Sequence, residues 1–78
     1  MTLTAPATVT VDSTLLASAT YDVGESLLQL EFRDGAIYLY FAVPEATHQG
    51  LLAADSKGFY FNSQIRSRFR YTRLRRPK

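Results

Sequence analysis

Two runs of alternating hydrophobic and polar residues stand out in the chain, one on each side of Asp34-Gly35. The first run covers residues 28–33 and the second covers residues 36–43. A period of two residues is typical of a β-strand that is buried on one face. Asp-Gly between two such runs favours a two-residue type I′ turn, in which both central residues need positive φ. The sequence therefore predicts a β-hairpin centred on Asp34-Gly35.

This hairpin would have one apolar face and one polar, aromatic face. A two-residue turn would pair Leu30 with Leu39, and the predicted core face would then consist of Leu28, Leu30, Phe32, Ile37, Leu39 and Phe41. The opposite face would carry Gln29, Glu31, Tyr38 and Tyr40. A bulged three-residue loop would change the partners, but we expect the same division within each strand because side chains alternate in either case.

A further strand is predicted before the hairpin. The apolar residues Leu15, Ala17, Ala19 and Tyr21 occupy alternate positions, and the polar Ser18 and Thr20 lie between the last three. A turn follows at residues 22–25. Val9 and Val11 alternate with threonines, so this strand either begins earlier or follows another short strand. We expect residues 1–10 as a whole to form a flexible amino-terminal tail, because residues 2–8 are a mixture of threonine, alanine and proline.

Two short helices are predicted after the hairpin. Pro44 suits the first turn of a helix, where its missing N–H has no partner, and Glu45 suits the positive helix end. The residues expected to face the hairpin are Thr47, Leu51, Leu52 and Ala54. Gly50 weakens this helix by up to about 1 kcal/mol relative to alanine, so we expect a packing reason for it. Ser56 is a natural N-cap for a second helix that continues to Ile65.

The segment after Ile65 fits two structures. As a strand it would place Arg66, Arg68 and Arg70 on one face, and as a helix it would stack Arg66, Arg70 and Arg73. Several guanidiniums share a side in both cases, and residues 75–78 are expected to form a frayed basic tail. The sequence thus predicts one α+β domain over residues 11–74, with a small antiparallel sheet of about three strands packed with two short helices.

Charge is distributed very unevenly along the chain. Residues 1–55 hold all seven acids and a single base, Arg33, which gives a net charge of −6, whereas residues 56–78 hold eight bases and no acid. Six arginines fall between residues 66 and 76, interleaved with Phe69 and Tyr71. Such a segment fits contact with an anionic partner better than general solubility, which would favour lysines and acids. A nucleic acid and an acidic protein surface both satisfy it.

The sequence argues against catalysis, metals and cofactors. It contains no cysteine and one histidine, His48, which is expected to lie solvated on a helix surface. A transition-metal site needs about three or four N, S or O ligands, and no such group is present. Motifs for nucleophilic catalysis or phosphate-binding loops are absent. The lack of cysteines, of an export signal and of an apolar span predicts a cytoplasmic protein without a membrane partner.

Residues 11–74 resemble the KTSC domain, a small bacterial family named for its occurrence at the carboxy terminus of some lysyl-tRNA synthetases. The resemblance rests on an ordered set of motifs: Val11 with Ser13, Tyr21-Asp22, Leu28 to Phe32 with Gly35, Tyr38-Leu39-Tyr40, Val43-Pro44, Leu51 with Ala54, Ser56-Lys57-Gly58, Tyr60-Phe61-Asn62 and Ile65-Arg66. Thr14 departs from the pattern, since the family more often has a second serine there. The synthetase association of the family implies RNA binding.

The expected function is a non-enzymatic binding module. Tyr38 and Tyr40 on an exposed sheet face could stack unpaired bases; the alternative is that both pack beneath a helix or the carboxy-terminal segment, with their hydroxyls at the rim. Lys57 follows Ser56 at a helix start, where free N–H groups can hold a phosphate, although an ordinary N-cap explains the same residues. The candidate nucleic-acid contacts are Tyr38, Tyr40, Lys57, Arg66, Arg68, Arg70 and Arg73. The alternative function is a protein adaptor whose arginines contact an acidic partner.

Overall fold

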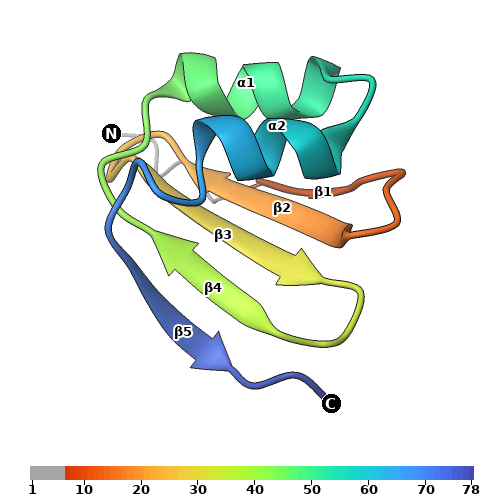
Figure 1. The fold of residues 1–78 in the computed structure, drawn as a ribbon. Coiled ribbons are helices and arrows are strands. Elements are labelled where there is room, and N and C mark those ends of the chain that lie inside the picture. Colours follow the sequence, from red (N-terminus) through yellow and green to blue (C-terminus); the bar gives the residue numbers. More distant parts are fainter. Residues whose placement is uncertain (1–6) are drawn as a thin grey trace.

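A single antiparallel sheet forms one layer of the molecule and two helices form the other (Figure 1). The computed structural model describes residues 7–78. Its strands are β1 (Ala7–Thr10), β2 (Leu16–Asp22), β3 (Leu27–Phe32), β4 (Ile37–Tyr40) and β5 (Tyr71–Arg75). The helices, α1 (Glu45–Ala53) and α2 (Lys57–Gln64), connect β4 to β5 and cover the same face of the sheet.

The sheet has five strands, so the expected number of about three was too low. The strands lie side by side in the order of the sequence, and each pairs antiparallel with the next. The two additional strands are the edges. β1 overlaps the expected flexible tail, of which residues 1–6 lie outside the described part. β5 lies in the arginine-rich segment, and all five of its residues are exposed, so it lacks the apolar alternation that marks a strand.

The β3–β4 turn is longer by one residue than predicted, and this reverses the faces of β4. Phe32 N–H donates to Ala36 O (2.8 Å), and Gly35 N–H donates to Phe32 O (2.9 Å), which leaves residues 33–35 as the loop. Gly35 alone in this loop has positive φ (95°), as in a type I turn followed by a bulge. Leu30 consequently lies opposite Tyr38 rather than Leu39. The prediction that Ile37, Leu39 and Phe41 face the core was therefore wrong.

A bulge in β2 changes the expected pattern there too. The register with β3 shifts between Leu16 and Ser18, so Leu16 is fully buried while Ala17 is only half-buried. Ala19 and Tyr21 lie in the core as predicted. The extra residue of a bulge moves one side chain to the other face, which strict alternation from Leu15 does not anticipate.

The helix α2 begins where the sequence predicts, and α1 begins one residue later than predicted, because Pro44 is its extended N-cap rather than its first residue. The hydroxyl of Ser56 accepts a hydrogen bond from Phe59 N–H (3.2 Å), which confirms it as the N-cap of α2. The packing reason for Gly50 is Tyr60: a Cβ on Gly50 would clash with the Tyr60 hydroxyl, which donates to Thr47 O (3.0 Å). No helix within residues 7–78 is long and apolar enough to cross a membrane.

The core lies between the helices and the sheet. Its fully buried side chains include Leu16, Leu28, Leu30, Val43, Leu51 and Ile65. His48 is also buried, with 7% of its surface exposed, and stacks on the ring of Tyr21 (centroids 4.7 Å apart). The expectation of a solvated His48 was therefore wrong, because the buried side of α1 runs through His48 and Leu51 rather than Thr47 and Leu51.

Candidate nucleic-acid interface

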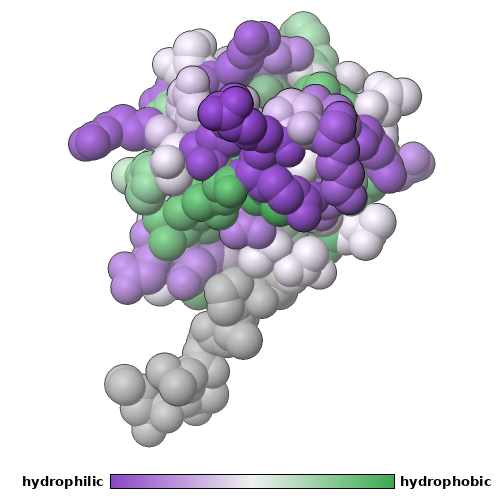
Figure 2. Space-filling view, turned by 90° about the horizontal axis from the view of Figure 1, so that it is seen from below, coloured by the Kyte–Doolittle hydropathy of each residue, from purple (hydrophilic) through white to green (hydrophobic). Residues whose placement is uncertain are grey.

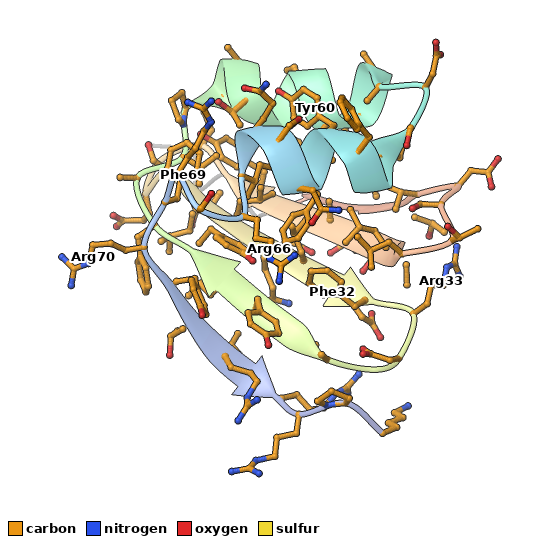
Figure 3. All side chains as sticks on the ribbon, in the orientation of Figure 1. Phe32, Arg33, Tyr60, Arg66, Phe69 and Arg70 are labelled. Carbon is orange, nitrogen blue, oxygen red and sulfur yellow. The ribbon has the colours of Figure 1, made fainter. Side chains whose placement is uncertain are left out.

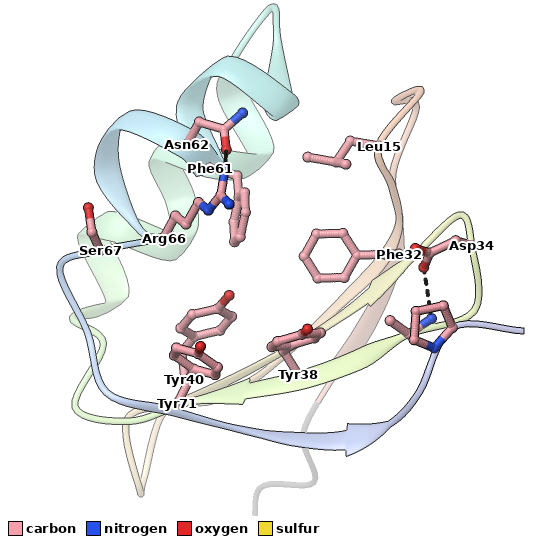
Figure 4. A pocket seen from close by; sticks show the side chains of 12 residues that line it. Leu15, Phe32, Asp34, Tyr38, Tyr40, Phe61, Asn62, Arg66, Ser67 and Tyr71 are labelled. Carbon is pink, nitrogen blue, oxygen red and sulfur yellow. Dashed lines mark hydrogen bonds between the residues drawn. The ribbon is translucent and has the colours of Figure 1, made fainter.

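A cleft of about 600 Å³ opens between α2 and the β4–β5 part of the sheet (Figure 4). The sheet provides the floor, α2 and the segment that follows it provide one wall, and the β3–β4 loop closes one end. Its lining residues are Leu15, Phe32, Asp34, Ala36, Tyr38, Tyr40, Phe61, Asn62, Arg66, Ser67, Tyr71 and Pro77. A volume of this size falls within the range of sites that bind small molecules or single chemical groups.

Five aromatic rings form the inner surface of this cleft. Tyr40 lies opposite Tyr71 in the β4–β5 ladder, and their ring centroids are 5.6 Å apart. Tyr38 contacts both of them, at 6.4 Å from Tyr40 and 5.5 Å from Tyr71. Phe61 of α2 and Phe32 of β3 complete the cluster with edge-on contacts. Because β4 is shifted by one residue from the predicted register, its tyrosines point toward the helices.

The three tyrosines of the floor differ in exposure. Tyr40 is buried, with 2% of its surface exposed, so it belongs to the core. Tyr38 is half-buried, and Tyr71 is 55% exposed. The packing alternative for Tyr40 is therefore confirmed, while Tyr38 both packs on the core and faces the cleft. Ring surface for a ligand is available mainly from Tyr71 and Tyr38.

The hydroxyls of these tyrosines are free to act as hydrogen-bond donors. Tyr21 and Tyr60 donate to backbone carbonyls, whereas Tyr38, Tyr40 and Tyr71 make no hydrogen bond within residues 7–78. Burial raises the pKa of the Tyr40 hydroxyl to about 12; Tyr38 and Tyr71 add to this rise, and the guanidinium of Arg66 opposes it. The Tyr40 hydroxyl therefore stays protonated at every physiological pH.

Arg66 places a positive charge at the wall of the cleft. It follows Ile65, the C-cap of α2, its backbone N–H donates to Phe61 O (2.9 Å), and its guanidinium extends toward the sheet (Figure 3). Nη1 of Arg66 donates to Asn62 Oδ1 (3.3 Å), one helical turn earlier. This contact leaves most of the five guanidinium N–H donors of Arg66 for a ligand. The cleft thus combines aromatic surface with a cation.

The arginines of β5 lie on opposite faces of the sheet. Residues opposite each other in an antiparallel pair share a face. Arg73 lies opposite Tyr38 and hence on the side of the cleft. The register then shifts, and Arg75 lies opposite Ile37 on the other face, where its guanidinium binds the Glu31 carboxylate (3.2 Å). Seen from the side of β5, the surface combines crowded hydrophilic groups with a strip of apolar residues (Figure 2).

The expected grouping of Arg66, Arg68 and Arg70 on one side was wrong. Residues 65–70 form turns between α2 and β5 rather than a strand or a helix. Arg66 lines the cleft, whereas Arg68 and Arg70 line a second hollow. The guanidinium of Arg68 donates to Ser63 O (3.0 Å), and that of Arg70 points away from the body of the molecule (Figure 3).

Lys57 lies apart from the cleft, in a third hollow at the start of α2. Its ammonium donates to Ala54 O (2.8 Å) at the end of α1. Asp12 and Asp55 line the same hollow. Two carboxylates beside the helix start oppose an anion there, so the geometry favours the capping interpretation of Ser56 and Lys57.

Sequence reasoning missed three important members of the cleft: Tyr71, Asn62 and Phe61. The sequence places Tyr71 only among the arginines, and it places Phe61 and Asn62 only in the Tyr60-Phe61-Asn62 motif of the family resemblance. Their convergence depends on β5 returning to the edge of β4 after two helices. Phe61, Arg66 and Tyr71 follow one another at intervals of five residues, which match neither the helical nor the strand period, so no local pattern groups them.

Comparison with known proteins identifies the class of this domain. The model of the KTSC domain family matches residues 12–69. The crystal structure of a KTSC domain protein from Yersinia pestis superimposes with a TM-score of 0.86 and 33% identity, over 91% of this chain and 100% of that one. The chain therefore belongs to the KTSC domain family, as the sequence motifs indicated.

Relatives occur both as short proteins and inside a larger enzyme. A protein of Tsukamurella paurometabola is 42% identical over 64 residues, which cover 82% of this chain and 96% of that protein. A lysine–tRNA ligase of Nostoc punctiforme is 32% identical over 63 residues, which are 81% of this chain but 11% of the ligase. The same domain thus exists nearly alone and as a small part of a much longer protein.

Proposed function

We propose that this domain binds single-stranded RNA and that the cleft holds one of its bases. The supporting observation is the cleft itself, where exposed tyrosine rings, unbonded tyrosine hydroxyls and the Arg66 guanidinium converge. Aromatic rings stack on unpaired bases, and arginine binds phosphate through several N–H donors. We propose binding without catalysis, since the described residues of the cleft include no pair of groups suited to acid–base or nucleophilic chemistry.

The individual roles follow from exposure. Tyr71 and Tyr38 offer ring surface, and a base would stack on them. Arg66 and Arg73 lie on the same side of the sheet and would contact the adjoining phosphates. Tyr40 is buried, so its role is to hold the other two rings in place and to offer its protonated hydroxyl. The relationship to a lysine–tRNA ligase, an enzyme named for a tRNA substrate, supports RNA as the ligand.

Titration with a single-stranded oligoribonucleotide at low salt tests this proposal. The chain has no tryptophan, so its intrinsic fluorescence comes from its five tyrosines. Stacking on Tyr71 and Tyr38 should quench this fluorescence, and Tyr71→Ala should remove most of the quenching and weaken binding. Phe59→Ala is the matched control, because Phe59 is 73% exposed on α2 and lies outside the cleft. Absence of binding at low salt would refute the proposal and favour the adaptor that contacts an acidic protein.

A further inference from the structure

A second hollow, of about 430 Å³, adjoins the cleft at the end of the β4–β5 ladder. It is lined by Phe41, Ala42, Arg68, Phe69 and Arg70. Tyr40 and Tyr71 are the last pair of the ladder and line the cleft, and the next pair is joined by a hydrogen bond from Phe41 N–H to Arg70 O (2.9 Å). Neighbouring residues in the chain thus line the two sites: Tyr40 and Tyr71 line the cleft, and Phe41 and Arg70 line this hollow.

The hollow repeats the chemistry of the cleft. Two aromatic side chains, Phe41 and Phe69, lie beside two arginines, Arg68 and Arg70. Phe41 is 38% exposed, which leaves ring surface for a ligand. None of the lining residues is acidic, in contrast to the hollow around Lys57, which contains two carboxylates. Aromatic surface beside guanidiniums with no carboxylate in the lining suits a nucleotide, whose base stacks and whose phosphate is anionic.

The backbone at this hollow is held in an uncommon conformation. Ala42 has φ of 56°, in the left-handed region that residues other than glycine rarely adopt. Hydrogen bonds on both sides fix it, from Phe41 N–H to Arg70 O and from Val43 N–H to Ser26 O (2.9 Å). Non-glycine residues in this region persist where the surrounding structure enforces them, and they cluster at binding sites.

We infer that this hollow is a second subsite for the same single-stranded nucleic acid and binds the nucleotide that follows the one in the cleft. This inference rests on the proposed function. A strand that leaves the cleft beside Arg66 meets the turn of residues 65–70 and then Arg68 and Arg70. Its next base stacks on Phe41, and its phosphate binds Arg70, whose guanidinium extends into solvent (Figure 3). The bound strand thus passes the end of β4 and β5, with one nucleotide in the cleft and the next in the second hollow.

The test compares a labelled single nucleotide, which can occupy only one of the two sites at a time, with an RNA oligomer of about eight nucleotides by fluorescence anisotropy. Phe41→Ala should weaken oligomer binding at least about five-fold, the factor that corresponds to about 1 kcal/mol of stacking, and should leave binding of the single nucleotide to the cleft unchanged. Phe59→Ala, which removes an exposed phenylalanine elsewhere, should change neither. Arg70→Ala should act like Phe41→Ala, whereas Arg76→Ala, which removes the same charge outside both hollows, should have a smaller effect.

The outcomes separate this inference from the proposal on which it rests. If Tyr71→Ala weakens binding of both ligands and Phe41→Ala and Arg70→Ala weaken neither, or weaken both equally, the second subsite does not exist and the cleft still stands. If the unmodified protein binds neither ligand at low salt, both proposals fail. Circular dichroism of each variant checks folding. If Phe41→Ala unfolds, the test rests on Arg70→Ala, which should weaken binding of the oligomer and leave binding of the short ligand unchanged.

Discussion

The imidazole of His48 lies parallel to the ring of Tyr21, with an interplanar angle of 12°, and neither of its nitrogens has a hydrogen-bond partner within residues 7–78. Tyr21 itself donates its hydroxyl to Val43 O. The ring of His48 thus contributes to the fold by packing between α1 and the sheet, not by hydrogen bonding. Burial lowers the pKa of His48 below 6.5, and the nearby carboxylate of Glu45 only partly opposes this.

The lowered pKa of His48 predicts that the fold loses stability in mild acid. Above pH 6.5 the side chain is neutral in both the folded and the unfolded chain, and its contribution is fully present. Below that pH the unfolded chain binds a proton more readily, so the free energy of unfolding falls until the folded pKa is passed. Urea titrations between about pH 7 and pH 5 should show this decline. His48→Phe, which keeps the stacking, should abolish that part of the pH dependence; an unchanged slope would contradict the assignment.

Replacement of Gly35 tests the observed hairpin loop. Gly35 has φ of 95°, and a Cβ there would lie 2.6 Å from Cγ of Lys78. Gly35→Ala should therefore destabilise the fold by about 1 kcal/mol or more. Gly24→Ala is the control, because a Cβ at Gly24 meets only Asp22 Oδ1 at an ordinary 3.4 Å. Thermal melts should show a lower midpoint for the first variant only.

Leu30 and Leu39 distinguish the observed register from the predicted one. Leu30 is fully buried, whereas Leu39 lies opposite Gln29 on the face that the helices do not cover. Leu30→Ala should cost about 2–5 kcal/mol of unfolding free energy. Leu39→Ala should cost clearly less, because the removed atoms are only half-buried. Equal losses in denaturant titrations would favour the two-residue turn and its core face.

Salt dependence tests which arginines contact a nucleic acid. Each phosphate contact with a single strand contributes about −0.7 to the slope of log K against log salt. Arg66→Ala and Arg73→Ala should each flatten the slope by about that amount. Arg75→Ala should not, because its guanidinium is already paired with Glu31 on the opposite face. Anisotropy titrations at several salt concentrations measure the slopes, and identical slopes for all three variants would exclude a phosphate site at the cleft.

Local signals made much of the fold predictable from the sequence. Ser56 marks a helix start through a cap that involves only its neighbour Phe59, and Pro44 marks the other through its fixed φ and missing N–H. The turn after Asp22 forms through bonds from Gly24 and Glu25 N–H to its own carboxylate. The strands β2 and β3 and the existence of the hairpin were likewise predicted from alternation. Motifs spread over the chain identified the family. For the helix starts, the turn and the strands, the deciding signals lie within a few residues.

The candidate site depended on features that are not local. One additional residue in the loop after Phe32 decides which face of β4 contains Tyr38 and Tyr40, and Asp-Gly is compatible with both loop lengths. β5 has no buried residue, so no hydrophobic pattern reveals it. Tyr71 therefore could not be assigned to the cleft from sequence, because its position follows from the pairing of β5 with β4. The distribution of the candidate arginines between the cleft and the second hollow could not be predicted either, because the segment 65–70 forms turns with no regular period.

The position of β5 at the edge of the sheet has a consequence for the motions of the domain. This strand is paired on one side only, and all its side chains are exposed, so it can detach at a lower free energy than global unfolding. Its amides should exchange with deuterium before those of β3, which is paired on both sides. Detachment removes Tyr71 and Arg73 together from the floor of the cleft. A bound strand that holds these residues would slow exchange along β5 and leave β3 unchanged, so amide exchange reports occupancy of the cleft.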